Sequence, residues 1–126
     1  MRFFIFSILV LISAFCLAQR KSVVAFYNVE NLFDTIDQPG TIDEEFLPSS
    51  KKQWNSERYT DKVNKLAFIM SQIGDSGTDA PDIIGLAEVE NRSVIEDLIK
   101  NENLSRFKYG IVHEDSPDAR GIDVAL

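Results

Sequence analysis

Residues 81–91 read PDIIGLAEVEN, and this stretch decides the fold class. Within it, residues 82–89 form a short, mostly apolar run that follows Pro81 and ends in acidic residues. A run of this length, bounded by turn signals and acids, predicts a buried strand. Residues 22–28 (SVVAFYN) have the same character and predict a second buried strand.

The sequence between these two strands predicts a long loop followed by a helix. Residues 34–56 are polar and contain Pro39, Gly40 and Pro48, and Phe46 and Trp54 are expected to pin this loop to the core. Residues 58–73 predict a helix, because their apolar side chains recur at helical spacing. This stripe consists of Tyr59, Val63, Leu66, Ala67, Met70 and Ile73.

Helix boundaries and the remaining elements follow from capping residues and further apolar runs. Ser56 or Thr60 is expected to cap the first helix, and Gly74 to end it in a left-handed conformation. Ser93 and Glu96 have the form of a capping box, which predicts a second helix up to about Lys100. Two more strands are expected at residues 107–113 and 121–126. The alternation of strands and helices predicts an α/β fold.

The N-terminus has the composition of an export signal. A basic start, an apolar stretch over residues 3–17 and small residues before position 19 predict a signal peptide, residues 1–18, cleaved after Ala18. An uncleaved anchor or a lipidated Cys16 is the alternative. After cleavage we expect a periplasmic or extracellular protein with no stable membrane span. With a single Cys, the chain cannot form an intrachain disulfide.

The charge balance narrows the range of possible functions. Lys and Arg number 13 against 20 Asp and Glu, so the formal net charge is −7. This argues against a protein that holds polyphosphate backbones by bulk positive charge, and an acidic protein that acts on phosphate esters needs a local device such as a metal ion.

Polar side chains follow both predicted buried strands. Asn28 and Glu30 end the first strand and Glu88 ends the second, and parallel neighbours would bring Asn28 and Glu88 to one sheet edge. A carboxylate beside a carboxamide suits a hard cation such as Mg²⁺, which prefers oxygen ligands. Equally, Glu88 could cap the following helix or simply end the strand in solvent.

Four segments then resemble the endonuclease/exonuclease/phosphatase family. FYNVENLFD (residues 26–34) is similar to its opening motif, PDIIGLAEVEN to its second and SPDARGIDVAL (residues 116–126) to its third. Trp54 with Glu57, Arg58, Tyr59 and Lys62 is similar to the segment between the first two. The resemblance runs from about residue 23 to residue 126.

The resemblance implies a fold and an activity. The family fold is a four-layer α/β-sandwich in which two mixed β-sheets pack face to face with helices outside. Its members hydrolyse phosphodiesters or phosphomonoesters with a divalent metal, most often Mg²⁺, with Mn²⁺ or Ca²⁺ as alternatives. The substrate class is therefore a phosphate ester, whether nucleic acid, phosphorylated small molecule or lipid headgroup.

The resemblance also assigns roles to residues. Glu88 would hold the metal, Asn28 would orient the scissile phosphate or the attacking water, and Glu30 would be a second acidic ligand. Arg120 would contact a phosphate or instead pair with Asp118. His113 does not match the family's catalytic His, so no general base is assigned in this chain.

The family domain extends well beyond the third motif, to an Asp-x-Asn motif and a terminal Asp and His. We therefore expect residues 19–126 to be the N-terminal part, or half, of a truncated family domain, whose first sheet keeps one apolar face without a partner. The alternative function is a catalytically inactive fragment or a binding or pairing module.

Overall fold

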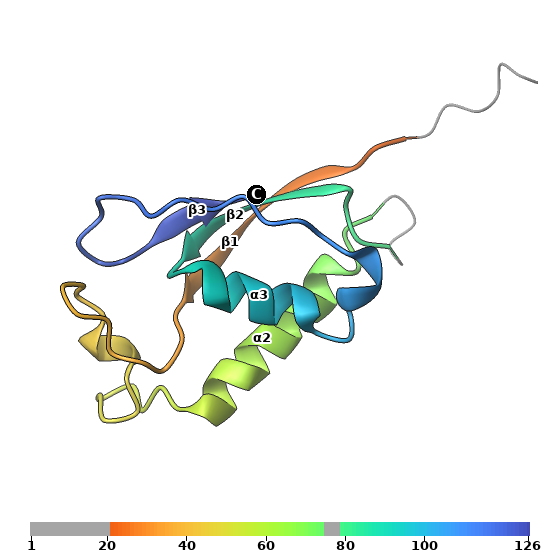
Figure 1. The fold of residues 1–126 in the computed structure, drawn as a ribbon. Coiled ribbons are helices and arrows are strands. Elements are labelled where there is room, and N and C mark those ends of the chain that lie inside the picture. The colour runs from red at the N-terminus through yellow and green to blue at the C-terminus, as the bar shows by residue number, and fades with distance from the viewer. Residues whose placement is uncertain (1–20, 75–78) are drawn as a thin grey trace, which may run out of the picture.

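The computed structural model describes residues 21–74 and 79–126, so the predicted signal peptide lies outside the described residues. Along the chain, strands and helices alternate (Figure 1). The elements are β1 (Val24–Leu32), α2 (Ser56–Met70), β2 (Ile83–Val89), α3 (Arg92–Lys100) and β3 (Asp123–Ala125), with short 3-10 helices at Glu44–Phe46 and Ser105–Phe107. None of the described helices is long and apolar enough to cross a membrane.

The strands form one mixed sheet in the order β1-β2-β3. β1 and β2 are parallel, which the crossover through α2 allows, and β3 is antiparallel to β2. Figure 1 shows α2 and α3 on the same side of this sheet. The predicted α/β class is confirmed, with a mixed sheet of three strands and two helices in the described part of the chain.

Both helices are capped at their N-termini by an asparagine rather than by the predicted residues. The Asn55 side chain accepts a hydrogen bond from the backbone N–H of Arg58, so Ser56 and Thr60 do not cap α2. The Asn91 side chain accepts from the N–H groups of Ser93 and Val94, which replaces the predicted capping box. Asparagine is as good an N-cap as serine, and here it stands one or two residues earlier.

The predicted end of the first helix is also wrong. α2 ends at Met70 with Ser71 as its C-cap, three residues before the predicted boundary at Ile73. Gly74 does not adopt the left-handed conformation; its N–H instead donates to the carbonyl of Asp79 at 2.5 Å.

The predicted strand over residues 107–113 is not formed. Phe107 closes a 3-10 helix, Lys108 has a left-handed backbone (φ 55°), and only His113 makes a bridge to Ala125. Val112 and Leu126 exchange two backbone hydrogen bonds, of 2.6 and 2.9 Å. This segment is therefore extended only at its end, where it lies beside β3.

The core lies between the sheet and the two helices. Leu86 and Val89 of β2 pack in one buried cluster with Met70 of α2 and Leu98 of α3. The predicted pins of the long loop are confirmed, because Phe46 stacks on Phe33 at 4.1 Å and packs edge-on against the buried Trp54.

The opposite face of the sheet is exposed and apolar. Val24 and Ile83 are direct partners on neighbouring strands, and Phe26, the next residue on this face of β1, is 72% exposed. Large exposed apolar residues on the strands and the adjoining segment are Val24, Phe26, Ile83, Val112, Val124 and Leu126.

Candidate active site at the carboxyl ends of β1 and β2

The sequence predicted that the first strand ends at Asn28, but β1 continues to Leu32 through a bulge. Asn28 is the partner of Ala87 and Leu32 that of Val89, so β1 carries two more residues than β2 between these pairs. Glu30 and Asn31 have left-handed backbones, with φ of 54° and 61°. Bulges re-aim side chains, and they are common next to active sites.

Glu88 is itself the extra residue of a second bulge. Its φ is 64°, and β2 advances two residues from Ala87 to Val89 while β3 advances one from Val124 to Asp123. A left-handed backbone is uncommon for a residue other than glycine. Two bulges facing each other on neighbouring strands therefore present Asn28, Glu30 and Glu88 at one edge.

Asn28 and Glu88 meet at this edge, as the parallel arrangement of the strands predicted. Nδ2 of Asn28 donates to Oε1 of Glu88 at 2.9 Å. Oδ1 of Asn28 accepts the backbone N–H of Glu30 at 2.7 Å. The two contacts fix the orientation of the carboxamide, with its oxygen toward the bulge and its nitrogen toward the carboxylate.

The other two predicted site residues are Glu30, which lies in the β1 bulge, and Arg120. The Glu30 side chain is exposed at this edge. Arg120 pairs with Asp118 through Nε to Oδ1 at 3.1 Å and a second guanidinium nitrogen to Oδ2 at 2.6 Å. This fork lowers the pKa of Asp118 to about 2. The structure thus shows Arg120 paired with Asp118, the arrangement named above as the alternative to phosphate contact.

A hydrogen-bonded network that contains two acids, Glu90 and Asp34, follows the ends of β1 and β2. The buried Glu90 carboxylate accepts the backbone N–H of Asp34 at 2.6 Å, and the Asp34 carboxylate accepts from Nδ2 of Asn91, the α3 cap, at 3.1 Å. Burial raises the pKa of Glu90 to about 7, and the charges of Asp34 and Asp43 add to this effect. Asp34 therefore ties the loop after β1 to the start of α3.

The raised pKa of Glu90 makes the stability of the protein depend on pH. Between pH 4.5 and about 7 the folded protein keeps a proton that the unfolded chain has lost, so stability falls as pH rises through this window. Glu90→Gln should remove this fall and stabilise the protein at pH 8 by up to about 3 kcal/mol. Urea unfolding in EDTA at several pH values measures it, with exposed Glu102→Gln as the control. An unchanged pH slope in Glu90→Gln would show that Glu90 is not the group responsible.

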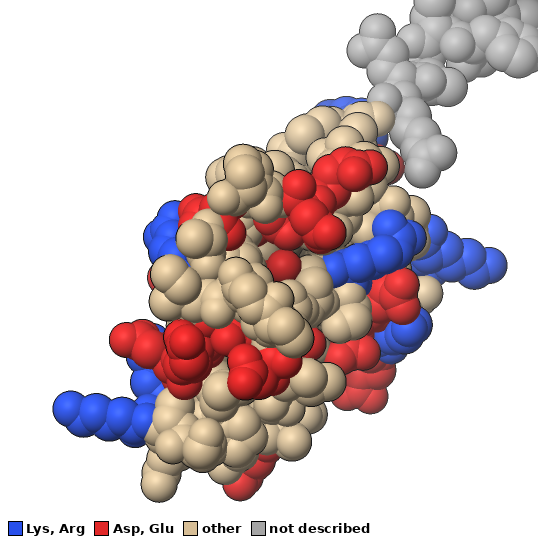
Figure 2. All heavy atoms as spheres, turned by 60° about the vertical axis from the view of Figure 1, so that its left-hand side comes forward, with Lys and Arg blue, Asp and Glu red and all other residues tan. Residues whose placement is uncertain are grey.

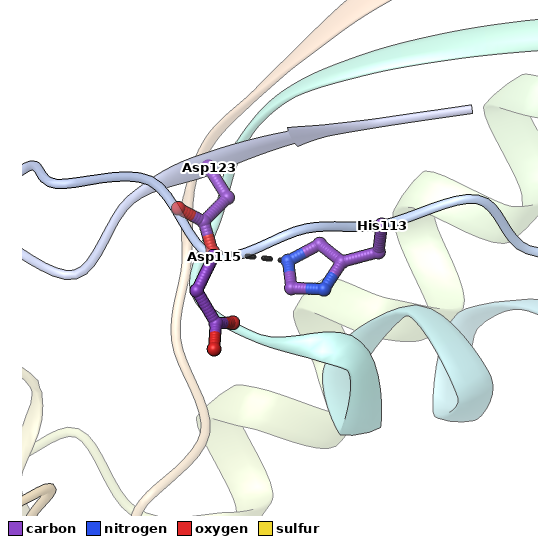
Figure 3. A group of neighbouring side chains, drawn as sticks. All are labelled: His113, Asp115 and Asp123. Carbon is purple, nitrogen blue, oxygen red and sulfur yellow. Dashed lines mark hydrogen bonds and ion pairs between the residues drawn. The ribbon is translucent and has the colours of Figure 1, made fainter.

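His113 lies in a separate polar group near the end of β2. Its Nε2 lies 3.0 Å from Oδ2 of Asp123, both side chains are 4% exposed, and the other Asp123 oxygen accepts the N–H of Ser116 at 2.8 Å. Asp115 completes the group, and one ligand atom from each of the three residues lies within 4.8 Å of the others (Figure 3). These residues could hold a metal ion, and they also form a satisfied His–Asp hydrogen bond without one.

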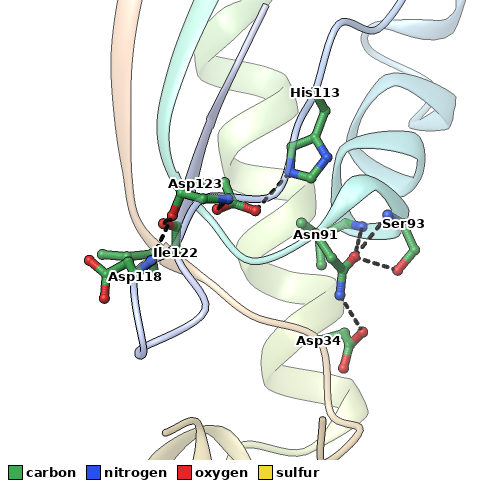
Figure 4. Close-up of polar contacts among 9 residues, drawn as sticks. Asp34, Asn91, Ser93, His113, Asp118, Ile122 and Asp123 are labelled. Carbon is green, nitrogen blue, oxygen red and sulfur yellow. Dashed lines mark hydrogen bonds and ion pairs between the residues drawn. The ribbon is translucent and has the colours of Figure 1, made fainter. Parts of the chain in front are cut away.

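Figure 4 shows this His–Asp pair and the Asp34–Asn91–Ser93 network at the end of β2. On the side of the molecule where the strands end, acidic side chains are prominent and Lys and Arg lie mostly at the margins (Figure 2).

The sequence did not predict two residues that contribute to this region. Asp123 lies inside the third motif, and Lys62 of α2 donates to the backbone of the β1 bulge.

Comparison with known proteins gives one family match. A model described as the endonuclease/exonuclease/phosphatase family matches residues 23–126. Neither the search of curated proteins nor that of solved structures gives a significant match.

Proposed function

Because the chain belongs to the endonuclease/exonuclease/phosphatase family, we propose that it forms part of a metal-dependent phosphoesterase whose catalytic edge contains Asn28 and Glu88. The reaction is hydrolysis of a phosphodiester or phosphomonoester bond. The single observation that supports this best is the hydrogen bond of 2.9 Å between Asn28 and Glu88, across two facing bulges.

The donor set fits a hard divalent cation bound to Glu88. The carboxylate of Glu88 supplies oxygen ligands, and the exposed carboxylate of Glu30 lies on the neighbouring bulge. Oδ1 of Asn28 accepts the N–H of Glu30 and Nδ2 donates to Glu88, so the carboxamide turns its donor side toward the carboxylate. A cation held here would polarise a phosphoryl oxygen and stabilise the charge that develops in the transition state.

Asn28 has a second amide hydrogen besides the one donated to Glu88. In the proposed mechanism this hydrogen binds a non-bridging phosphoryl oxygen and orients the ester for attack by water. The surrounding surface is acidic (Figure 2), so it does not attract a phosphate by its own charge. A cation bound to Glu88 would supply the positive charge that a phosphate needs at this edge.

Hydrolysis of model esters tests the proposal. The native protein should hydrolyse bis(p-nitrophenyl) phosphate, p-nitrophenyl phosphate or both, with activity lost in EDTA and restored by Mg²⁺ or Mn²⁺. A lack of metal-dependent hydrolysis of either ester and of nucleic acid would contradict the enzymatic function. A chain that binds the metal but hydrolyses nothing would favour the alternative, a binding module.

We further propose that the sheet is one layer of the family's four-layer sandwich. Its support is the exposed apolar face that carries Phe26 and Val24, because exposed apolar patches commonly mark interaction surfaces. Hydrogen exchange of the β1 amides in the native protein tests this, since a covered face protects them more strongly than an open one.

Export is proposed from the sequence of residues 1–18 alone. N-terminal sequencing of the secreted or periplasmic protein should begin at Gln19. A protein that stays in the cytoplasm with its N-terminus intact would contradict export.

A further inference from the structure

Lys62 reaches from α2 to the backbone of the β1 bulge. Its Nζ donates to the carbonyl oxygen of Glu30 at 2.5 Å and to that of Asn31 at 3.2 Å. The ammonium also lies 5.7 Å from the centre of the Trp54 ring. The Trp54 indole in turn donates to the carbonyl of Phe33 at 3.0 Å, so both side chains hold the chain at the end of β1.

The bulge needs such partners. Glu30 and Asn31 occupy the left-handed region, which is unfavourable for a residue such as Glu30 that is neither glycine nor asparagine. They also lie where the pairing of β1 with β2 shifts, and the Asn31 carbonyl accepts the backbone N–H of Phe33 at 3.2 Å besides the bond from Lys62. An ammonium has three donors and no acceptor, which suits it to satisfy two carbonyls that converge on one point.

The bulge is connected to the reactive edge through a single residue. Glu30 accepts from Lys62 with its carbonyl and donates with its N–H to Oδ1 of Asn28. The nitrogen of the same carboxamide donates to Glu88. A continuous series of hydrogen bonds therefore runs from Lys62 through the Glu30 backbone and Asn28 to the proposed metal ligand.

We propose that Lys62 is a positioning residue, which holds the β1 bulge and thereby orients the Asn28 carboxamide toward Glu88. This inference rests on the proposed function only for its catalytic meaning. Its structural content, the orientation of Asn28, is independent of metal and substrate.

The environment of Lys62 differs from that of an ordinary surface lysine. Lys65, on the same helix, is 71% exposed and pairs with Asp61, four residues away. Lys62 is instead half-buried, and burial lowers the pKa of its ammonium while the charges of Glu30 and Glu88 oppose this. An exposed pair such as Lys65–Asp61 contributes little, which makes Lys65 a suitable control.

The metal-free chain provides the first test. In nuclear magnetic resonance spectra the two side-chain N–H signals of Asn28 should be well separated in the wild type, because one hydrogen is bound to Glu88. Lys62→Met should move them together, to the positions of an exposed amide, while Lys65→Met leaves them unchanged. Lys62→Arg should retain the separation, because a guanidinium also donates to two carbonyls. Should Lys62→Met not fold, Lys62→Gln takes its place, with the same expected change.

Titration with Mn²⁺ provides the second test. Lys62→Met should weaken Mn²⁺ binding about ten-fold, the effect typical of groups that orient a metal ligand without touching the metal. Asn28 signals that stay unchanged in a folded Lys62→Met or Lys62→Gln variant would overturn the proposal. If the wild type binds no Mn²⁺ but its Asn28 signals respond to Lys62→Met, the proposed function fails and the positioning role of Lys62 stands.

Discussion

Replacing Glu88 by Gln should weaken the binding of Mn²⁺ by at least about 100-fold, because groups that only support a ligand already contribute 10- to 100-fold. Glutamine keeps an oxygen that can accept the hydrogen bond from Asn28, so the edge should stay folded while the negative charge is lost. Isothermal titration calorimetry of wild type and variant, at one pH and ionic strength, measures the ratio. Hydrolysis by the native protein should fall at least as far.

Glu30→Gln is the matched control for this experiment. Glu30 stands on the facing bulge, carries the same charge and is exposed, so its replacement changes the local charge equally. We expect a loss of a few-fold, since the Glu30 side chain would only supplement the ligand at Glu88. Equal losses in the two variants would indicate general electrostatic attraction rather than coordination by Glu88.

Replacing Asp123 by Ala should lower the free energy of unfolding by about 1–3 kcal/mol, the usual cost of leaving a buried hydrogen-bond partner unsatisfied. The Asp123 carboxylate is buried and serves both His113 and the backbone N–H of Ser116. Its loss would leave these two groups without their partner and loosen the contact between residues 112–116 and β3. Urea unfolding followed by circular dichroism measures the change.

Asp115→Ala distinguishes a structural from a metal-binding role of the same group. Asp115 is exposed, so its removal should change the free energy of unfolding by less than about 0.5 kcal/mol. If Zn²⁺ or Mn²⁺ raises the wild-type stability and Asp115→Ala removes that gain, the group holds a metal. A loss of under 1 kcal/mol in Asp123→Ala would contradict the structural role assigned to the His113–Asp123 pair.

The central strand and the meeting of Asn28 with Glu88 could be predicted from the sequence. The apolar run before Glu88 extends over a strand length, and β2 begins and ends within a residue of the prediction. The meeting of the two side chains needed only the rule that parallel strands end at one sheet edge. These features depend on apolar pattern and topology, which the sequence expresses directly.

The bulges could not be predicted, because nothing in the residue types requires them. Glu30 and Glu88 adopt left-handed backbones although neither is glycine or asparagine. The bulge that contains Glu30 also makes tertiary contacts, among them the hydrogen bonds from Lys62 to the carbonyls of Glu30 and Asn31. A residue pattern reports local preference, and here a lysine 32 positions away helps to override it.

The absent strand at residues 107–113 has a different cause. Phe107, Tyr109 and Ile111 alternate with polar or small residues, which predicts a half-buried strand. In the structure these three side chains pack against the core, but no continuous ladder forms, and Lys108 turns the chain. The alternation therefore reports burial of one side of an irregular segment.

The location of a bound metal tests the central claim most directly. Mn²⁺ broadens the amide signals of nearby residues, so wild type, Glu88→Gln and Asp115→Asn should be compared at the same substoichiometric Mn²⁺ concentration. We expect the strongest broadening at Asn28, Glu30 and Glu88, its loss in Glu88→Gln and its persistence in Asp115→Asn. Broadening that persists in Glu88→Gln and disappears in Asp115→Asn would place the metal beside His113 and contradict the assignment of Glu88 as the ligand.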